Sequence, residues 1–255
     1  MFAEFEPRFA FHLNLLANKR PPRVVFLHIP KCGGTSINHH FKSNFGGKRT
    51  KRSILLDSVV GNAAHSETIE AAKHAQYVAG HFGWNTLERV RESAIAFTIL
   101  REPFDRLRAL YAFARKPRQI AHIAFAKLAE IARSASFEEF CLSEDPSVRA
   151  MTDNAITRTL AHDYFPAAPA RAVDVGVARD HLDQLDFVGD VADLSAALPL
   201  LSEITQTRIV RGRTWLNQTP GAAGMTRQDF LADPALSARI AFDLEIYDYA
   251  KRRMA

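Results

Sequence analysis

The chain has 255 residues, of which 47% are hydrophobic and 24% are charged. This composition is typical of a folded globular protein and argues against a disordered or fibrous one, and the length allows a large core. The formal net charge of +5, with a pI near 9.4, is a weak indication of anionic partners.

Three apolar runs in the first hundred residues predict buried strands, and each ends at a polar or glycine-containing stretch. The runs are residues 23–29 (RVVFLHI), 75–81 (AQYVAGH) and 93–100 (SAIAFTIL). After the first strand, Thr35 or Ser36 is placed to cap a helix.

The third strand leads into a helix, because Pro103 suits a first helical turn. Its apolar positions recur at helical spacing and predict one buried stripe. They are Leu107, Leu110, Tyr111 and Ala114.

The rest of the chain reads mainly as helices, among them residues 136–142 and 153–162. A short strand is predicted at 185–190, a helix at 193–205, and one long amphipathic helix over 235–253. Alternating strands and helices predict an α/β fold with a parallel sheet. We expect an extension over residues 1–22 and a single domain over 23–255.

The stretch HIPKCGGTS (residues 28–36) has the chemistry of an anion-binding loop. A strand that turns through Gly33 and Gly34 into a helix presents backbone N–H groups and a positive helix end. A tight turn without a ligand is the alternative. The nucleoside-triphosphate loop places its Lys directly before Ser or Thr, whereas here Lys31 precedes the glycines. This order disfavours a kinase or NTPase.

The same stretch resembles the 5′-phosphosulfate loop of sulfotransferases that use 3′-phosphoadenosine 5′-phosphosulfate (PAPS). It is most similar to the carbohydrate branch that includes the heparan sulfate 2-O-sulfotransferases. The resemblance implies a P-loop-NTPase-like, three-layer fold with a central parallel sheet flanked by helices. It implies that Lys31 contacts the bridging oxygen of the donor. The implied phosphate contacts are Cys32, Gly33, Gly34, Thr35 and Ser36.

The segment TILREPFDRLRALYAFAR is similar to the family's 3′-phosphate-binding strand and helix. Arg101 is the match to the Arg that holds the 3′-phosphate, a group that suits a bidentate guanidinium. Where the family has a second ligand, a Ser, this chain has Ala109. Either Arg106 or Arg108 is a candidate to compensate.

Looser similarities supply the remaining site residues. The stretch VAGHFGW resembles the strand end that carries the family's general base, here His81, and a histidine suits proton abstraction from a sugar hydroxyl. Arg158, Asn217 and Thr219 are nucleotide contacts by resemblance alone. His28 and Trp84 are candidates for substrate binding, although Trp84 equally fits the core.

Other features leave alternatives open. Cys32 near a helix start suggests a nucleophilic thiol, but a small packed residue explains it better. The two cysteines show no metal-ligand spacing, and no metal is expected. The basic run GGKRTKR (residues 46–52) is either a solvated loop or an acceptor surface.

We therefore expect a PAPS-dependent sulfotransferase with a carbohydrate or glycolipid acceptor, for which an anionic acceptor would suit the basic charge. Nucleic acid is not expected. The alternatives are a non-enzymatic binding module for anionic glycan or nucleic acid and a diverged nucleotide phosphotransferase. No apolar run reaches the ~18 residues of a membrane span, and the N-terminus lacks the basic start of a signal peptide. A cytoplasmic, bacterial-type enzyme is the expectation.

Overall fold

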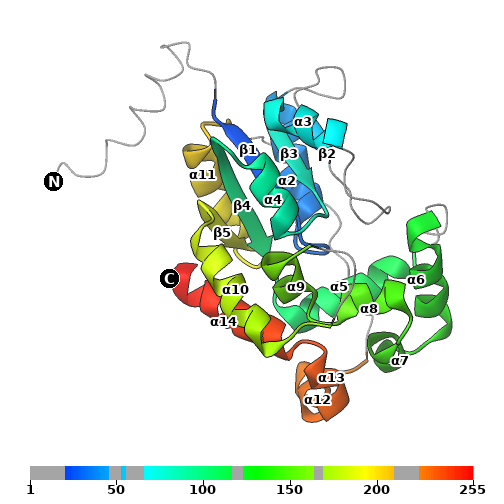
Figure 1. The fold of residues 1–255 in the computed structure, drawn as a ribbon. Coiled ribbons are helices and arrows are strands. Elements are labelled where there is room, and N and C mark those ends of the chain that lie inside the picture. The colour runs from blue at the N-terminus through cyan, green and yellow to red at the C-terminus, as the bar shows by residue number, and fades with distance from the viewer. Residues whose placement is uncertain are drawn as a thin grey trace.

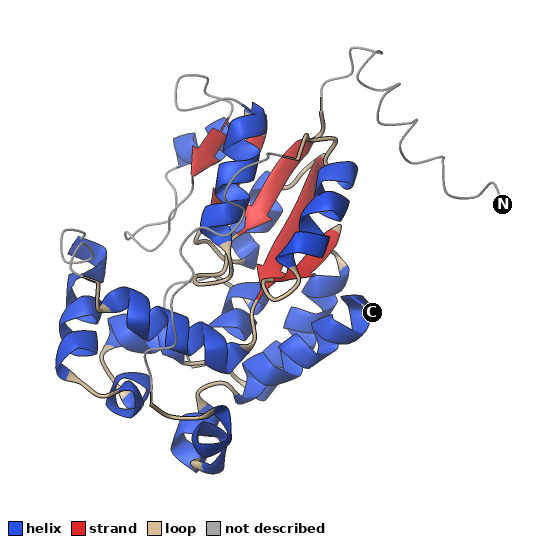
Figure 2. Ribbon diagram, turned by 180° about the vertical axis from the view of Figure 1, so that it is seen from behind, coloured by secondary structure: helices blue, strands red, loops and turns tan. Residues whose placement is uncertain are grey.

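The computed structural model describes residues 21–45, 53–55, 66–116, 123–163, 169–209 and 224–254. Five strands form one sheet in the order β2-β3-β1-β4-β5, and every neighbouring pair is parallel (Figures 1 and 2). The strands are β1 (Arg23–Leu27), β2 (Ser53–Leu55), β3 (Tyr77–Gly80), β4 (Ala94–Leu100) and β5 (Phe187–Asp190). The predicted α/β class and parallel sheet are confirmed, and β2 is an edge strand that the sequence did not indicate.

The strands are mainly apolar because helices cover both faces of the sheet. Val24 and Phe26 of β1 point to one face, and Val25 and Leu27 point to the other. The first face packs against α2 (Gly34–Phe45) and α11 (Leu194–Ile204). The second is covered by α3 (Ser66–His74), α4 (Trp84–Val90), α9 (Ala155–Ala161), α10 (Ala172–Asp183) and α14 (Ala241–Met254).

A separate helical cluster lies beyond the carboxyl ends of the strands, at the lower right of Figure 1. Its core is aromatic, with Phe104, Tyr111, Phe137 and Phe230 buried together. The cluster contains α5 (Pro103–Ala114), α6 (Ile123–Ser134), α7 (Phe137–Leu142), α8 (Pro146–Thr152), α12 (Arg227–Ala232) and α13 (Pro234–Ala238). The stripe predicted on α5 is confirmed, since all four of its residues are buried.

The prediction of one long helix over residues 235–253 is wrong, because the chain forms α13 and then α14. The backbone carbonyl of Arg239, between the two helices, accepts a 2.7 Å hydrogen bond from the Asn154 N–H. The Asn154 side-chain oxygen in turn accepts from the N–H groups of Phe242 and Asp243, which start α14. A distant residue therefore caps a new helix at this point. Within the described parts of the chain, every helix is too short or too polar to cross a bilayer.

Candidate functional site

The three sequence motifs meet at the carboxyl edge of the sheet. Parallel strands β1, β3 and β4 end side by side, with Leu27 in register with Gly80 and Thr98. The His28 N–H donates to the Gly80 carbonyl at 3.1 Å. Arg101 Nη1 lies 3.5 Å from the Lys31 carbonyl oxygen. The edge of a parallel α/β sheet is where ligands of such folds bind.

The loop between β1 and α2 has an unusual backbone. Lys31 adopts φ 69°, a left-handed conformation that is uncommon for a residue with a side chain, and Gly33 adopts φ 74°. Gly34 is required for a different reason, since a Cβ there would lie 1.7 Å from His28 Nε2. The N–H groups of Ser36 and Ile37 both donate to the Gly33 carbonyl as α2 begins. The loop is therefore closely packed on the His28 ring.

His81 is oriented by a backbone carbonyl. Its Nδ1 lies 2.8 Å from the His28 carbonyl oxygen, so Nδ1–H donates and the lone pair resides on Nε2. This is the tautomer that a general base at Nε2 requires. The two imidazole rings lie 4.2 Å apart, measured between their centroids.

His28 itself is held in the neutral form. Burial lowers its pKa well below the usual value, and its electrostatic interactions with His81 and Lys31 act in the same direction. The ring stacks on Phe26 with centroids 5.1 Å apart. Its contacts with Gly34 and His81 make it a support for both motifs, whereas substrate binding by His28 stays a prediction.

Three cations converge on the loop. Burial, followed by the positive charges of Lys116 and Arg101, lowers the pKa of the Lys31 ammonium to about 8. Lys31 Nζ lies 3.8 Å from the centroid of the Phe113 ring. Within the described residues, neither Lys31 nor Arg101 forms an ion pair with a carboxylate. Clustered cations that lack carboxylate partners favour an anionic ligand at this place.

The other side chains of the loop differ in their exposure to solvent. The Thr35 side chain is exposed, and that of Ser36 is 8% exposed at the start of α2. Cys32 is fully buried, and burial raises the pKa of its thiol to about 12. A protonated, buried thiol supports the packing interpretation of Cys32 over the nucleophilic one.

The residues expected to replace the missing Ser on α5 lie in different environments. Ala109 is 3% exposed. Arg106 is fully buried and donates from Nη2 to the Met151 carbonyl at 2.9 Å, which places its guanidinium in the interior. Arg108 is partly exposed and lines a cleft of about 550 Å³, together with residues of the 224–227 segment. Of the two candidates, only Arg108 is accessible to a ligand from solvent.

Trp84 belongs to the core. It is 1% exposed, and its ring stacks on His181 with centroids 4.0 Å apart and planes 7° apart. The guanidinium of Arg91 lies 4.8 Å from the Trp84 ring. Because no ring face of Trp84 is exposed, the core alternative accounts for this residue and sugar stacking does not.

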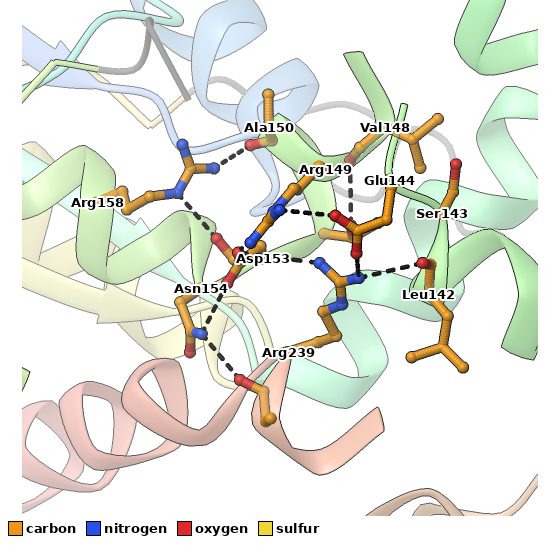
Figure 3. Close-up of polar contacts among 12 residues, drawn as sticks. Leu142, Ser143, Glu144, Val148, Arg149, Ala150, Asp153, Asn154, Arg158 and Arg239 are labelled. Carbon is orange, nitrogen blue, oxygen red and sulfur yellow. Dashed lines mark hydrogen bonds and ion pairs between the residues drawn. The ribbon is translucent and has the colours of Figure 1, made fainter. Parts of the chain in front are cut away.

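Arg158 lies in a polar joint between α8, α9 and α13 (Figure 3). It is 5% exposed, and it donates from Nε to the Asp153 carbonyl and from Nη2 to the Ala150 carbonyl. These bonds hold the turn that connects α8 to α9. Nucleotide contact by Arg158 stays a prediction, and Asn217 and Thr219 lie outside the described residues.

The same joint includes residues 154–158 at the start of α9, which form an Asn-x-x-Thr-Arg motif. Asp243, fully buried in α14, accepts from the N–H groups of Ile156 and Thr157 and from the Thr157 hydroxyl. Asn154 caps α14 in return. Two helices distant in sequence thus cap each other, which gives this motif a structural role.

The sequence motifs did not indicate two residues near the end of α5. Phe113 contacts the Lys31 ammonium, and Lys116 adds positive charge beside it. A signal for Phe113 was present, since it follows Ala109 by four residues and therefore shares the helix face turned toward the loop.

The fold and this site are those of an α/β protein in which a glycine loop leads from a strand into a helix at the carboxyl edge of a parallel sheet, the usual ligand-binding edge of such folds. The sequence model of the sulfotransferase family matches residues 15–165, which contain the loop, His81 and Arg101. The chain belongs to this family of enzymes, which transfer a sulfuryl group. A comparison with curated proteins found no match. Among the described residues, no group of three or more His, Cys, Asp or Glu side chains is placed to hold a metal ion.

Proposed function

We propose that this enzyme transfers the sulfuryl group of PAPS to a hydroxyl of a carbohydrate-type acceptor, as a member of the heparan sulfate 2-O-sulfotransferase-like branch. One observation carries the proposal. Lys31 and Arg101, from the ends of β1 and β4, meet through the Lys31 carbonyl and lack carboxylate partners among the described residues. His81 lies on the neighbouring strand end.

The cation arrangement fits a donor with two anionic ends. Arg101 offers a guanidinium for the 3′-phosphate, the group that distinguishes PAPS from ordinary adenine nucleotides. The loop N–H groups, the start of α2 and the Lys31 ammonium suit the 5′-phosphosulfate. Arg108 is the proposed second cation near the 3′ end, in place of the missing Ser.

The transfer is an in-line displacement. The acceptor oxygen forms a bond to sulfur while the bond from sulfur to the bridging oxygen breaks, and the electron pair stays on the departing 5′-phosphate. His81 Nε2 takes the acceptor's hydroxyl proton, because Nδ1–H is engaged by the His28 carbonyl. The Lys31 ammonium offsets the charge that grows on the bridging oxygen. The products are a sulfate ester and 3′-phosphoadenosine 5′-phosphate.

The donor is tested by calorimetry with 3′-phosphoadenosine 5′-phosphate and 5′-AMP. The 3′-phosphate should strengthen binding by about 10- to 100-fold, the worth of one or two charge-assisted bonds. Arg101→Ala should remove most of that difference and leave the affinity for 5′-AMP unchanged. Equal affinities of the wild-type protein for both nucleotides would exclude PAPS as the donor.

The base is tested by transfer of labelled sulfate from PAPS to a panel of oligosaccharides. His81→Ala should lower turnover by about 10²- to 10⁴-fold and preserve nucleotide affinity. His39→Ala, at an exposed position on α2, is the matched control and should behave as wild type. Full turnover in the His81 variant would remove His81 from the mechanism.

A further inference from the structure

The side of α5 that faces the phosphate loop carries an aromatic ring at the Lys31 ammonium. Phe113 is the last aromatic residue of α5, one residue before the helix ends at Ala114. Lys31 Nζ lies 3.8 Å from the centre of its ring, well within the ~6 Å range of a cation–π contact. Two other cation–π pairs that use rings of this helix are more distant, at 5.1 Å for Arg115 and Tyr111 and 5.6 Å for Arg108 and Phe104.

Without such a contact, little would fix this ammonium. The lysine side chain has four rotatable bonds and starts from a left-handed backbone. Lys116 and Arg101 repel it. No carboxylate among the described residues forms an ion pair with it. Among the residues that the structure describes, the Phe113 ring is an attractive group placed against the charge.

An aromatic ring is better suited than a carboxylate to fix the position of the Lys31 ammonium. A carboxylate beside Lys31 would hold the ammonium but would also cancel its charge and repel an anionic donor. The face of a phenyl ring attracts a cation through its quadrupole and carries no net charge. The ammonium therefore keeps its full charge for the ligand while its position is restricted.

We infer that Phe113 is a positioning residue that holds the Lys31 ammonium at the mouth of the phosphate loop. The effect of Phe113 on the reaction rate rests on the proposed role of Lys31 at the bridging oxygen. The placement of the ammonium by Phe113 does not depend on that role, because it is a property of the protein without a donor.

The first test measures Lys31 directly in the full-length protein without nucleotide. Competitive acetylation over a range of pH, followed by mass spectrometry of the Lys31 peptide, gives the proton affinity of that amine. Phe113→Leu keeps an apolar group of similar size but removes the ring, so the proton affinity should fall by about 3- to 30-fold. Phe113→Tyr should match wild type.

Phe140→Leu is the matched control, since it removes a fully buried ring from the same helical cluster, where that ring packs on Tyr111. It should leave the Lys31 profile unchanged. An unchanged profile in Phe113→Leu would overturn the inference. So would a shift toward higher proton affinity, because the ring would then only exclude water from the ammonium. If Phe113→Leu does not fold, a Phe113→Tyr profile that departs from wild type overturns it equally.

The second test uses sulfuryl transfer. In Phe113→Leu, kcat should fall by about 3- to 30-fold while KM for the donor changes by less than about twofold, and Phe113→Tyr should restore kcat. A fall in kcat of the same size in Phe140→Leu would indicate loss of packing and contradict positioning. If Phe113→Leu shifts the acetylation profile but the wild-type protein transfers no sulfuryl group from PAPS, the inference about Phe113 stands and the proposed function is wrong.

Discussion

The phosphate loop and the α8–α9 joint are both rich in cations, but the cations have different kinds of partner in the two regions. At the joint, Arg149 pairs with Glu144 at 2.6 Å and with Asp153 at 3.2 Å, and Arg239 also contacts both carboxylates (Figure 3). At the loop, the described residues offer Lys31 a ring and Arg101 a backbone carbonyl.

The difference separates cations that hold the chain together from cations reserved for a ligand. Buried or partly buried charge is costly unless it is paired, so a structural arginine is surrounded by carboxylates and carbonyls. Cations left without carboxylates at a strand edge retain that cost until an anion arrives. Residue type alone does not distinguish the two groups, whereas their partners do.

The largest expected effect comes from disturbing the loop at Gly34. Gly34→Ala would place a Cβ 1.7 Å from His28 Nε2, so the loop or the ring must move. Displacement of about 1 Å in such a site can cost about 100-fold, and we expect nucleotide affinity measured by calorimetry to fall at least that far.

Gly176→Ala is the control for that prediction. Gly176 is exposed within α10, and a Cβ there would meet no atom within 4 Å. It should stabilise the protein by about 0.5 to 1 kcal/mol and leave nucleotide affinity unchanged. Wild-type affinity in Gly34→Ala would contradict the described packing of loop on ring.

A substitution at the α8–α9 joint should lower the stability of the protein but leave its nucleotide affinity unchanged. Asn154→Ala removes the acceptor for the first N–H groups of α14 and places Ala at φ 44°. We expect a loss of about 2 to 3 kcal/mol in urea denaturation, with unchanged nucleotide affinity of the folded protein. Asn85→Ala, at an exposed position, should cost far less. A selective loss of affinity would assign the joint to the site.

The depressed pKa of Lys31 predicts an alkaline limit to turnover. The free enzyme's ammonium gives up its proton near pH 8 and not near 10.5, so kcat/KM for the donor should fall as pH rises through about 8, by about tenfold at pH 9. Lys31→Arg should abolish this limb, since a guanidinium keeps its charge. A kcat/KM that stays level up to pH 10 in the wild-type enzyme would exclude a required Lys31 charge.

The lowered pKa of Lys31 also determines how the stability of the protein changes with pH. Between about pH 8 and 10.5 the unfolded chain holds a proton that the folded chain has released, so the contribution of Lys31 to stability rises with pH over this window. Turnover and stability should therefore change in opposite directions there, which a denaturation series run alongside the rate profile would show.

The smallest effect is expected at Glu144. It accepts contacts from Arg149 and Arg239, and the hydrogen bond from Arg239 lowers its pKa, but the carboxyl side chain is 66% exposed. Exposed ion pairs contribute little because water and salt screen them. Glu144→Gln should leave the urea midpoint near that of wild type, and any loss should disappear in high salt. A large loss that persists in salt would show that the joint depends on this pair.

Much of this protein was predictable from local sequence. Apolar runs between glycine and polar stretches indicated β1, β3, β4 and β5, and strand–helix alternation indicated the parallel sheet. The glycine loop and the Arg-Glu-Pro segment indicated an anion site, because backbone conformation and charge are properties of a few adjacent residues.

Tertiary structure decided the rest, through contacts that no short window contains. Whether Trp84 is a sugar platform or core depended on His181, and the division of the tail into α13 and α14 depended on Asn154. Arg158 and Lys31 are both cations beside predicted motifs, yet carbonyls of α8 engage one and the ring of Phe113 holds the other. The sequence supplied the charges, and only the packing of distant segments determined which charges have partners, because desolvation and pairing depend on proximity in space.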